Sequence, residues 1–291
     1  QCVRMKRVVS ILVCLLACVF ALGGVAACQF SAPQDPQSTT IVSPSPASSP
    51  ASSDDGADTA ASFEERAREI LSAMTLEEKC GQLFFVYMPG TKAVSRERKW
   101  QYGGYVLFTK NFEGKTPAQF TKELGKCQKA AKVDMFFSID EEGGVVNRAS
   151  VLPEFGHEPF QSPRALFAQG GWKRVVEDTA DKAEYLQGLG LNENFAPVAD
   201  VPYGTGNYMY SRSFSVKAKQ CTKYVRKVVR RYVESGLVCC LKHFPGYGAN
   251  VNTHTLLSTD ERDLATYEKR DLLPFRAGIK AGAPMVMVNH N

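Results

Sequence analysis

The 291-residue sequence lacks the features typical of a disulfide-stabilised or nucleotide-binding protein. The first apolar run that reads as a strand continues as "VYMPGTKAV", without a glycine-rich phosphate-binding turn. Adjacent Cys239 and Cys240 would point to opposite faces of a strand, which argues against a shared metal site. Outside the N-terminal segment the cysteines are odd in number and lie mostly in apolar runs, so we expect core packing: Cys80, Cys127, Cys221, Cys239 and Cys240.

A strongly basic surface is also absent. The formal net charge is +5, and the basic residues are scattered apart from one cluster, "RKVVRR" at 226–231. That cluster lies in a helical pattern, where a solvated helix face explains it. No nucleic-acid-binding motif accompanies it, so we expect no nucleic-acid partner.

The first 62 residues are expected to precede the folded domain. Residues 1–28 contain a basic "MKR" that begins at the expected start, Met5, then an apolar run interrupted by Gly and Cys, then "VAAC". This arrangement resembles a bacterial lipoprotein signal with Cys28 lipidated, although an ordinary signal peptide cut after Ala27 is the alternative. Residues 29–62 are rich in Ser and Pro and predict a flexible linker. We therefore expect an extracytoplasmic, membrane-anchored bacterial lipoprotein whose folded domain is 63–291.

From residue 63, short apolar runs alternate with helical patterns. The runs cover 80–88, 103–108, 134–140, 191–200, 238–244 and 283–290. Helical patterns occupy 62–74, 116–132, 172–190 and 216–236, and Thr75 with Glu78 predicts a capping box. Nearly continuous apolar strands separated by helices indicate a parallel sheet covered by helices.

Polar residues close several of these runs, namely Asp140, Asp200, His243 and His290. Parallel strands end at one face, so these side chains are expected to converge, as at the active-site face of a (β/α)8 barrel. A doubly wound sheet is the alternative, but its usual glycine-rich turn is missing. The fold class predicted is therefore an α/β protein, a (β/α)8 TIM-type barrel. Only six strands can be counted, so we expect the barrel to be truncated after about the sixth.

A series of motifs in one order carries a family resemblance. They are "MTLEEKCGQLFF", "GGYVLFTKNF", "SIDEEGGVVNR", "FAPVADV", "SRSF", "KHFPGYG", "TH", "LLPFRAGIKAGA" and "VMVNH". Together they resemble the N-terminal barrel of glycoside hydrolase family 3, and within it the bacterial β-N-acetylhexosaminidase branch. The resemblance extends from about residue 74 to Asn291.

The resemblance implies roles for particular residues. Asp140 and Arg148 would hold the terminal sugar, and Lys242 and His243 would also bind substrate. Arg212 would be a second sugar-binding arginine, although Ser211 stands where the family usually has an aspartate. Glu141 and Glu142 are interpreted as structural or rim residues, and Asp200 likewise.

The resemblance also implies that His254 is the general acid and base. Histidine suits this role because its ordinary pKa of about 6.5 lets it give and take a proton near neutrality. The family places a partner aspartate two residues earlier, where this chain has Asn252. An amide can orient the ring but cannot stabilise an imidazolium, so the protein is slow, or Asp260 or Asp263 substitutes, or the copy is degenerate.

The activity implied is an exo-acting, retaining hydrolase that removes terminal β-linked N-acetylhexosamine (N-acetylglucosamine), in cell-wall or chitooligosaccharide turnover. The substrate would be an oligosaccharide or glycan, and no metal or organic cofactor is expected. The family's nucleophile, an aspartate on the seventh strand, is expected beyond Asn291. The alternatives are a family 3 β-glucosidase or xylosidase, and a sugar-binding lipoprotein whose catalysis has decayed.

Overall fold

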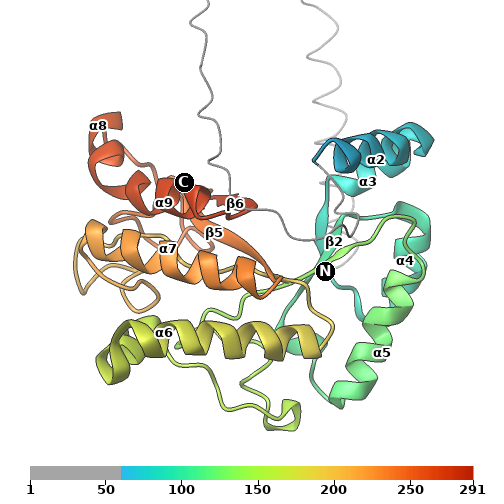
Figure 1. Ribbon diagram of the computed structural model, residues 1–291, viewed down its shortest axis with the longest axis horizontal. Helices are drawn as coiled ribbons and strands as arrows, with labels where there is room; N and C mark the ends of the chain where they lie inside the picture. The colour runs from blue at the N-terminus through green and yellow to red at the C-terminus, as the bar shows by residue number, and fades with distance from the viewer. Residues whose placement is uncertain (1–59, 291) are drawn as a thin grey trace, which may run out of the picture. The chain divides into compact units, whose positions relative to one another are not determined.

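The computed structural model describes residues 60–290, so the predictions about the signal, Cys28 and most of the linker lie outside the described residues. Six strands form one parallel sheet in the order of the sequence, β1 to β6 (Figure 1). Consecutive order is the arrangement of a (β/α) barrel, because a doubly wound sheet reverses direction at a switch point. The six strands form a curled half-barrel, which confirms the predicted fold class.

The strands are short and their bounds refine the predicted runs. They are β1 (Phe85–Tyr87), β2 (Gly104–Leu107), β3 (Phe136–Ile139), β4 (Glu193–Asn194), β5 (Val238–Phe244) and β6 (Met285–Val288). Two predictions need correction. Cys80 lies in a helix and is exposed, because the Thr75–Glu78 capping box starts a helix that continues through it. The run 191–200 supplies only a two-residue strand, since Pro197 has no amide hydrogen to continue the ladder.

Helices cover the outside of the sheet (Figure 1). They are α2 (Ala60–Ala73), α3 (Leu76–Gln82), η1 (Gly90–Lys92), α4 (Ala93–Trp100), η2 (Thr109–Asn111), α5 (Pro117–Gln128), η3 (Pro153–Phe155), α6 (Pro163–Gly188), α7 (Ala218–Glu234), α8 (Leu264–Thr266), η4 (Tyr267–Asp271) and α9 (Leu272–Lys280). Helix α7 packs between α6 and α9.

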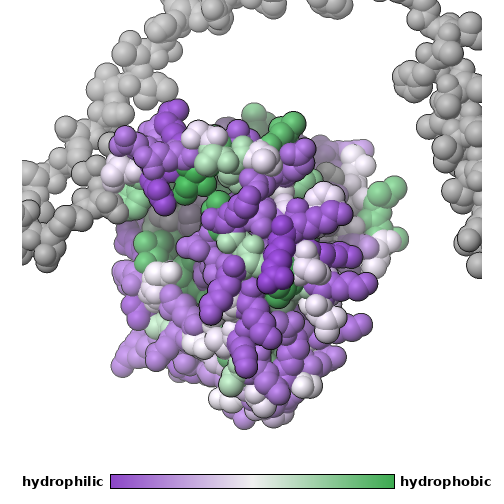
Figure 2. Space-filling view, turned by 90° about the vertical axis from the view of Figure 1, so that its right-hand side faces the viewer, coloured by the Kyte–Doolittle hydropathy of each residue, from purple (hydrophilic) through white to green (hydrophobic). Residues whose placement is uncertain are grey.

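Helices α5 and α7 each bury one face against the strands. In α5 the buried residues Phe120, Leu124 and Cys127 recur at helical spacing, and in α7 Val225 and Val229 do the same. They meet strand residues in one core cluster. The opposite faces are hydrophilic, as Figure 2 shows for one side of the molecule, where apolar groups are small and separate. Arg226 and Arg230 are exposed on α7, which confirms that the basic cluster is a solvated helix face.

Four of the five cysteines outside the N-terminal segment are buried and none is in a disulfide, as their apolar surroundings predicted. Within the described part of the chain, no helix is both long and apolar enough to cross a membrane. The packing of the helices on the sheet leaves the carboxyl ends of the strands, with their loops, gathered at one face.

Candidate active site

A cleft of about 590 Å³ opens where the strands end. It receives side chains from the ends of β2, β3, β5 and β6 and from the loops after β4 and β5. The structure brings all seven site residues predicted from the sequence to its wall: Asp140, Arg148, Arg212, Lys242, His243, Asn252 and His254. The convergence expected from parallel strands is therefore observed.

The floor of the cleft is a buried ion cluster centred on Lys242. Its Nζ lies 2.5 Å from Oδ1 of Asp140 and 2.6 Å from Oε1 of Glu142. Burial alone would lower the pKa of Lys242, but the two carboxylates raise it above its ordinary value, so the ammonium stays charged. Asp140 is the more exposed of the two carboxylates and faces the cleft.

Arg212 closes the cluster from the loop between β4 and α7. Its Nε and Nη2 donate to the two carboxylate oxygens of Glu142 at 2.9 and 2.6 Å, a two-pronged pair. Burial would raise the pKa of Glu142, but Lys242 and Arg212 outweigh it and lower the pKa to about 2. Of the two roles interpreted for Glu142 from the sequence, structural or rim, the structure supports the structural one: Glu142 is the buried anion that holds two candidate substrate-binding cations in place.

His243 is oriented from beneath by a carboxylate. Its Nδ1 lies 2.7 Å from Oδ2 of Asp200, which also accepts from the backbone N–H of His243 at 3.2 Å. The second oxygen of Asp200 accepts from the backbone N–H of Tyr247 at 2.8 Å. Asp200 is buried and has the structural role interpreted for it. With Nδ1 engaged, Nε2 of His243 is presented toward Arg212, 3.5 Å from its Nη2.

The guanidinium of Arg148 has an unpaired hydrogen-bond donor. Its Nε is buried without a hydrogen-bond partner among residues 60–290, and its guanidinium lies 5.6 Å from the ring centre of Phe108. The backbone N–H of Arg148 donates to Glu141 at 2.9 Å, so Glu141 fixes this turn, consistent with the structural role proposed for it. An unpaired buried donor at the wall of a cleft favours a polar ligand.

His254 stands on the exposed loop after β5. Its Nδ1 and its backbone N–H both reach Oδ1 of Asn252, at 2.9 and 3.1 Å. This pairing puts the proton on Nδ1 and leaves Nε2 to exchange a proton with a ligand. Burial, His290, Arg212 and His243 lower the pKa of His254 below its ordinary value, against a smaller opposing effect of Asp140.

No alternative carboxylate replaces the amide among the described residues. Asp260 is held by Arg262 and by Asn250, whose Nδ2 donates to it at 2.8 Å. Asp263 is exposed and accepts from the backbone N–H of Thr266 at 2.7 Å, as the N-cap of α8. The idea that one of them partners His254 is therefore wrong in this structure. The second histidine near the ring is His290, whose ring centre lies 5.2 Å away, edge to face.

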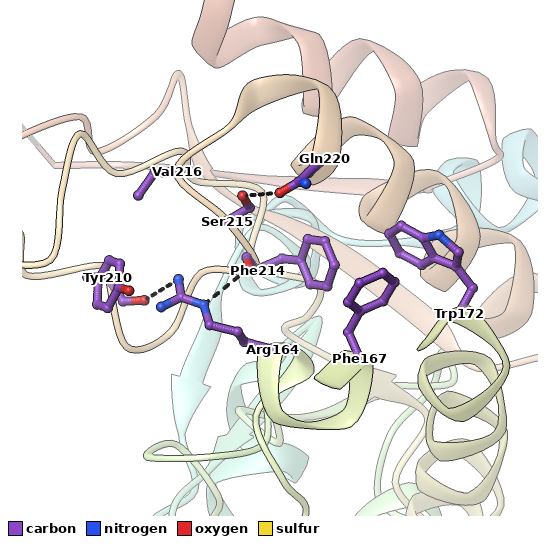
Figure 3. A pocket seen from close by; sticks show the side chains of 8 residues that line it. All are labelled: Arg164, Phe167, Trp172, Tyr210, Phe214, Ser215, Val216 and Gln220. Carbon is purple, nitrogen blue, oxygen red and sulfur yellow. Dashed lines mark hydrogen bonds between the residues drawn. The ribbon is translucent and has the colours of Figure 1, made fainter. Parts of the chain in front are cut away.

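The far side of the loop that carries Arg212 forms a second, smaller pocket of about 240 Å³ (Figure 3). Arg164 reaches across it and donates to the backbone carbonyls of Tyr210, Ser213 and Phe214 at 3.1, 3.0 and 3.3 Å. These carbonyls bracket Arg212. The remaining polar groups pair with each other, since Ser215 donates to Gln220 at 2.5 Å. This pocket supports the loop and presents few free polar groups.

Within residues 60–290, no group of three or more His, Cys, Asp or Glu side chains is arranged to hold a metal ion. The arrangement is instead one of fixed hydrogen-bond donors around a carboxylate, with a titratable imidazole at the rim. Such a cleft can hold a neutral polyhydroxylated ligand and exchange a proton with it.

The strand order and this cleft define the first six strands of a (β/α)8 barrel with a polar site at the carboxyl ends of its strands. Residues 75–291 match the Glycosyl hydrolase family 3 N terminal domain. The chain belongs to this family.

The chain is also similar to bacterial proteins named Beta-hexosaminidase. It is 31% identical over 221 residues to one from Xanthomonas axonopodis pv. citri (strain 306), covering 72% of this chain and 64% of that protein. A protein of the same name from Xylella fastidiosa (strain 9a5c) is 33% identical over 221 residues, with 72% and 63% covered. The chain therefore spans slightly less than two thirds of the length of these relatives.

Solved structures show the same fold. A glycoside hydrolase family 3 beta-N-acetylglucosaminidase from Paenibacillus sp. str. FPU-7 has a TM-score of 0.68 at 30% identity, covering 75% of this chain and 42% of that one. A glycosyl hydrolase of the GH3 family from Mycobacterium smegmatis has a TM-score of 0.66 at 27% identity, with 76% and 66% covered.

The sequence did not reveal the partners of two buried carboxylates beside the cleft, Glu142 and Asp200. The motif "DEEGG" offered a signal for Glu142, because a charged residue before two glycines can turn back under the strand ends. Nothing in the linear sequence separates Glu141 from Glu142, yet one holds backbone amides and the other holds two cationic side chains.

Proposed function

We propose that the full-length protein is an exo-acting glycoside hydrolase that removes terminal β-linked N-acetylhexosamine, with N-acetylglucosamine as the sugar, by a retaining mechanism. The observation that carries the proposal is that one cleft is lined by fixed hydrogen-bond donors around Asp140 and by the titratable imidazole of His254, which stands on a loop. The names of the relatives support the choice of sugar.

The ion cluster is suited to gripping sugar hydroxyls. Asp140 can accept from two neighbouring hydroxyl groups while Lys242 and Arg148 donate to the same ring. Because Glu142 already fixes Lys242 and Arg212, these donors lose little conformational freedom when a ligand arrives. Such a cluster of donors and acceptors on one sugar ring suits an enzyme that acts on the terminal sugar of a chain.

His254 would act in both steps of the retaining reaction. As an imidazolium it would give its Nε2 proton to the glycosidic oxygen as that bond breaks, while a carboxylate forms a covalent glycosyl-enzyme. The neutral imidazole would then take a proton from the water that attacks the intermediate. We propose that the carboxylate is an aspartate in the sequence after Asn291, on a seventh strand; reading that sequence checks the idea.

We propose further that the enzyme acts outside the cytoplasm, anchored to a membrane through lipidated Cys28, on peptidoglycan fragments or chitooligosaccharides. The lipoprotein-like residues 1–28 and the Ser/Pro-rich residues 29–62 support this location. Incorporation of a labelled fatty acid into the wild-type protein and its loss in Cys28→Ala would test it, and unlabelled wild-type protein would contradict it.

Hydrolysis of nitrophenyl β-N-acetylglucosaminide by the full-length protein tests the activity, with nitrophenyl β-glucoside as the matched control. Cleavage of the first alone is the expected result, and preference for the glucoside or xyloside would overturn it. A second candidate, a sugar-binding protein without catalysis, is favoured by Asn252 and Ser211 alone. Calorimetric binding of N-acetylglucosamine without turnover of either substrate would select that candidate.

A further inference from the structure

The loop that carries His254 has little apolar support of its own. It runs from the end of β5 to α8 without regular secondary structure, and its outer residues Val251, Leu256 and Leu257 are exposed. The position and reach of His254 therefore depend on polar contacts at the base of the loop. Local regions with few buried apolar contacts open most easily.

One side chain, Arg262, joins the two ends of this loop. Its Nη2 donates to the carbonyl oxygen of Gly246 at 2.8 Å, at the start of the loop. The same nitrogen lies 2.6 Å from Oδ2 of Asp260, and Nε lies 2.8 Å from Oδ1, at the end of the loop. A planar guanidinium can serve both ends at once because its donors form a rigid fork.

The fork is anchored to the body of the domain. Nη1 of Arg262 forms an ion pair at 2.8 Å with Oδ2 of Asp271, which is fully buried at the junction of η4 and α9. The guanidinium also lies 4.2 Å from the ring centre of Tyr267. Gly248 makes room for it, because a Cβ atom there would lie 2.5 Å from the guanidinium carbon.

The contacts of Arg262 with Gly246, Asp260 and Asp271, here called the Arg262 clamp, are connected to residues nearer the histidine. Asn250 donates to Asp260 at 2.8 Å, so the carboxylate that Arg262 holds also fixes a residue four positions before His254. Tyr247 bonds to Thr253 at 2.5 Å between the hydroxyl groups, immediately before His254. Two sets of hydrogen bonds therefore hold the loop: the Tyr247–Thr253 bond beside the histidine, and the Arg262 bonds where the loop begins and ends.

We propose that Arg262 is the positioning residue of the acid/base loop: by joining Gly246, Asp260 and Asp271 it sets the placement of His254 at the cleft. This inference rests on the proposed function, in which His254 exchanges the proton. The inference predicts that loss of the Arg262 clamp weakens proton transfer more than it weakens sugar binding.

The test compares leaving groups in the full-length protein. A dinitrophenyl group departs without a proton, whereas a phenyl group needs general-acid assistance. For Arg262→Gln we expect kcat/KM on phenyl β-N-acetylglucosaminide to fall about tenfold or more, within the range of general-acid contributions. On the dinitrophenyl glycoside it should change by less than about twofold, and His254→Ala should show the same selectivity more strongly.

Two further variants keep the result interpretable. Asp260→Asn removes the negative charge and one of the two acceptor oxygens at the end of the loop but leaves the buried Arg262–Asp271 pair, and it should show the same leaving-group selectivity. Arg276→Gln is the matched control, since Arg276 is exposed and pairs at 3.4 Å with exposed Glu268, away from the loop contacts. It should leave both substrates unaffected.

Equal losses on both substrates in Arg262→Gln and Asp260→Asn, or no loss in either, would overturn the positioning role while the proposed function stands. A wild-type protein that cleaves neither glycoside would instead overturn the proposed function, and this inference with it.

Discussion

Nδ1 of His254 lies 2.9 Å from the amide oxygen of Asn252. The amide fixes the ring as a carboxylate would, but it carries no charge to stabilise an imidazolium. The pKa of His254 is accordingly lowered, because burial and three cationic or titratable neighbours act on the ring with only Asp140 opposing them. An aspartate would both orient the ring and stabilise its positive charge, whereas Asn252 only orients it.

We expect Asn252→Asp to raise turnover of phenyl β-N-acetylglucosaminide by the full-length protein. The reason is that a carboxylate at the same distance would stabilise the imidazolium. The gain should lie between about tenfold and about 10⁴-fold, the cost of the reverse change in a serine-protease triad. Steady-state kinetics measure it. The double variant Asn252→Asp/His254→Ala should lose the gain, and unchanged or lower turnover in the single variant would refute the prediction.

The alkaline limb of the pH profile should lie below the ordinary histidine pKa of 6.5. In bond cleavage His254 must be protonated, so kcat/KM should fall as pH rises through its lowered pKa. His290→Ala should move the limb upward, because it removes a neighbour that lowers the pKa. The pH profile of kcat/KM on the phenyl glycoside measures both. A wild-type limb above pH 6.5 would contradict the lowered pKa of His254.

Glu142 should make stability depend on pH in the acid range. Its pKa is about 2 in the folded state against 4.5 as its ordinary value, so its contribution is full above about pH 4.5 and is lost as pH falls toward 2. The difference corresponds to about 3 kcal/mol. About 2 kcal/mol of it should be lost between pH 7 and pH 3, which urea unfolding at these two pH values measures.

The variant Glu142→Gln should be less stable at pH 7 by about 3 kcal/mol, because it leaves Lys242 and Arg212 with less compensation. It should also lose the matching part of the acid dependence. Glu113→Gln, at an exposed position, is the control and should behave as wild type. Identical acid dependence in Glu142→Gln and wild type would count against the assigned ion cluster.

Arg164→Ala should weaken substrate binding from the far side of the Arg212 loop. The three carbonyls that Arg164 holds would lose their donor, so we expect KM to rise about tenfold with a smaller change in kcat. Lys173→Ala, at an exposed position on the same helix, should leave both constants unchanged. A fall in kcat at constant KM would show that the arginine does not act through binding.

The sequence by itself determined the fold class and the approximate positions of the strands, and its resemblance to glycoside hydrolase family 3 supplied the seven residues that meet in the cleft. Strand geometry accounts for part of that set, because parallel strands all end at one face and residues such as Asp140 and His243 converge there whatever their separation in the chain. Strand bounds were less predictable, since Thr75 and Pro197 shift them through local hydrogen bonding.

Only the tertiary structure decided which charges meet. Glu142 is separated by 70 residues from Arg212 and by 100 from Lys242, and no periodicity connects them, so their ion pairs could not be read from the sequence. The same holds for Arg262, whose contacts with Gly246 and Asp271 depend on how the loop folds back on α9. Side-chain chemistry was enough to identify the candidate site residues, but only their positions in the folded chain show which of them interact.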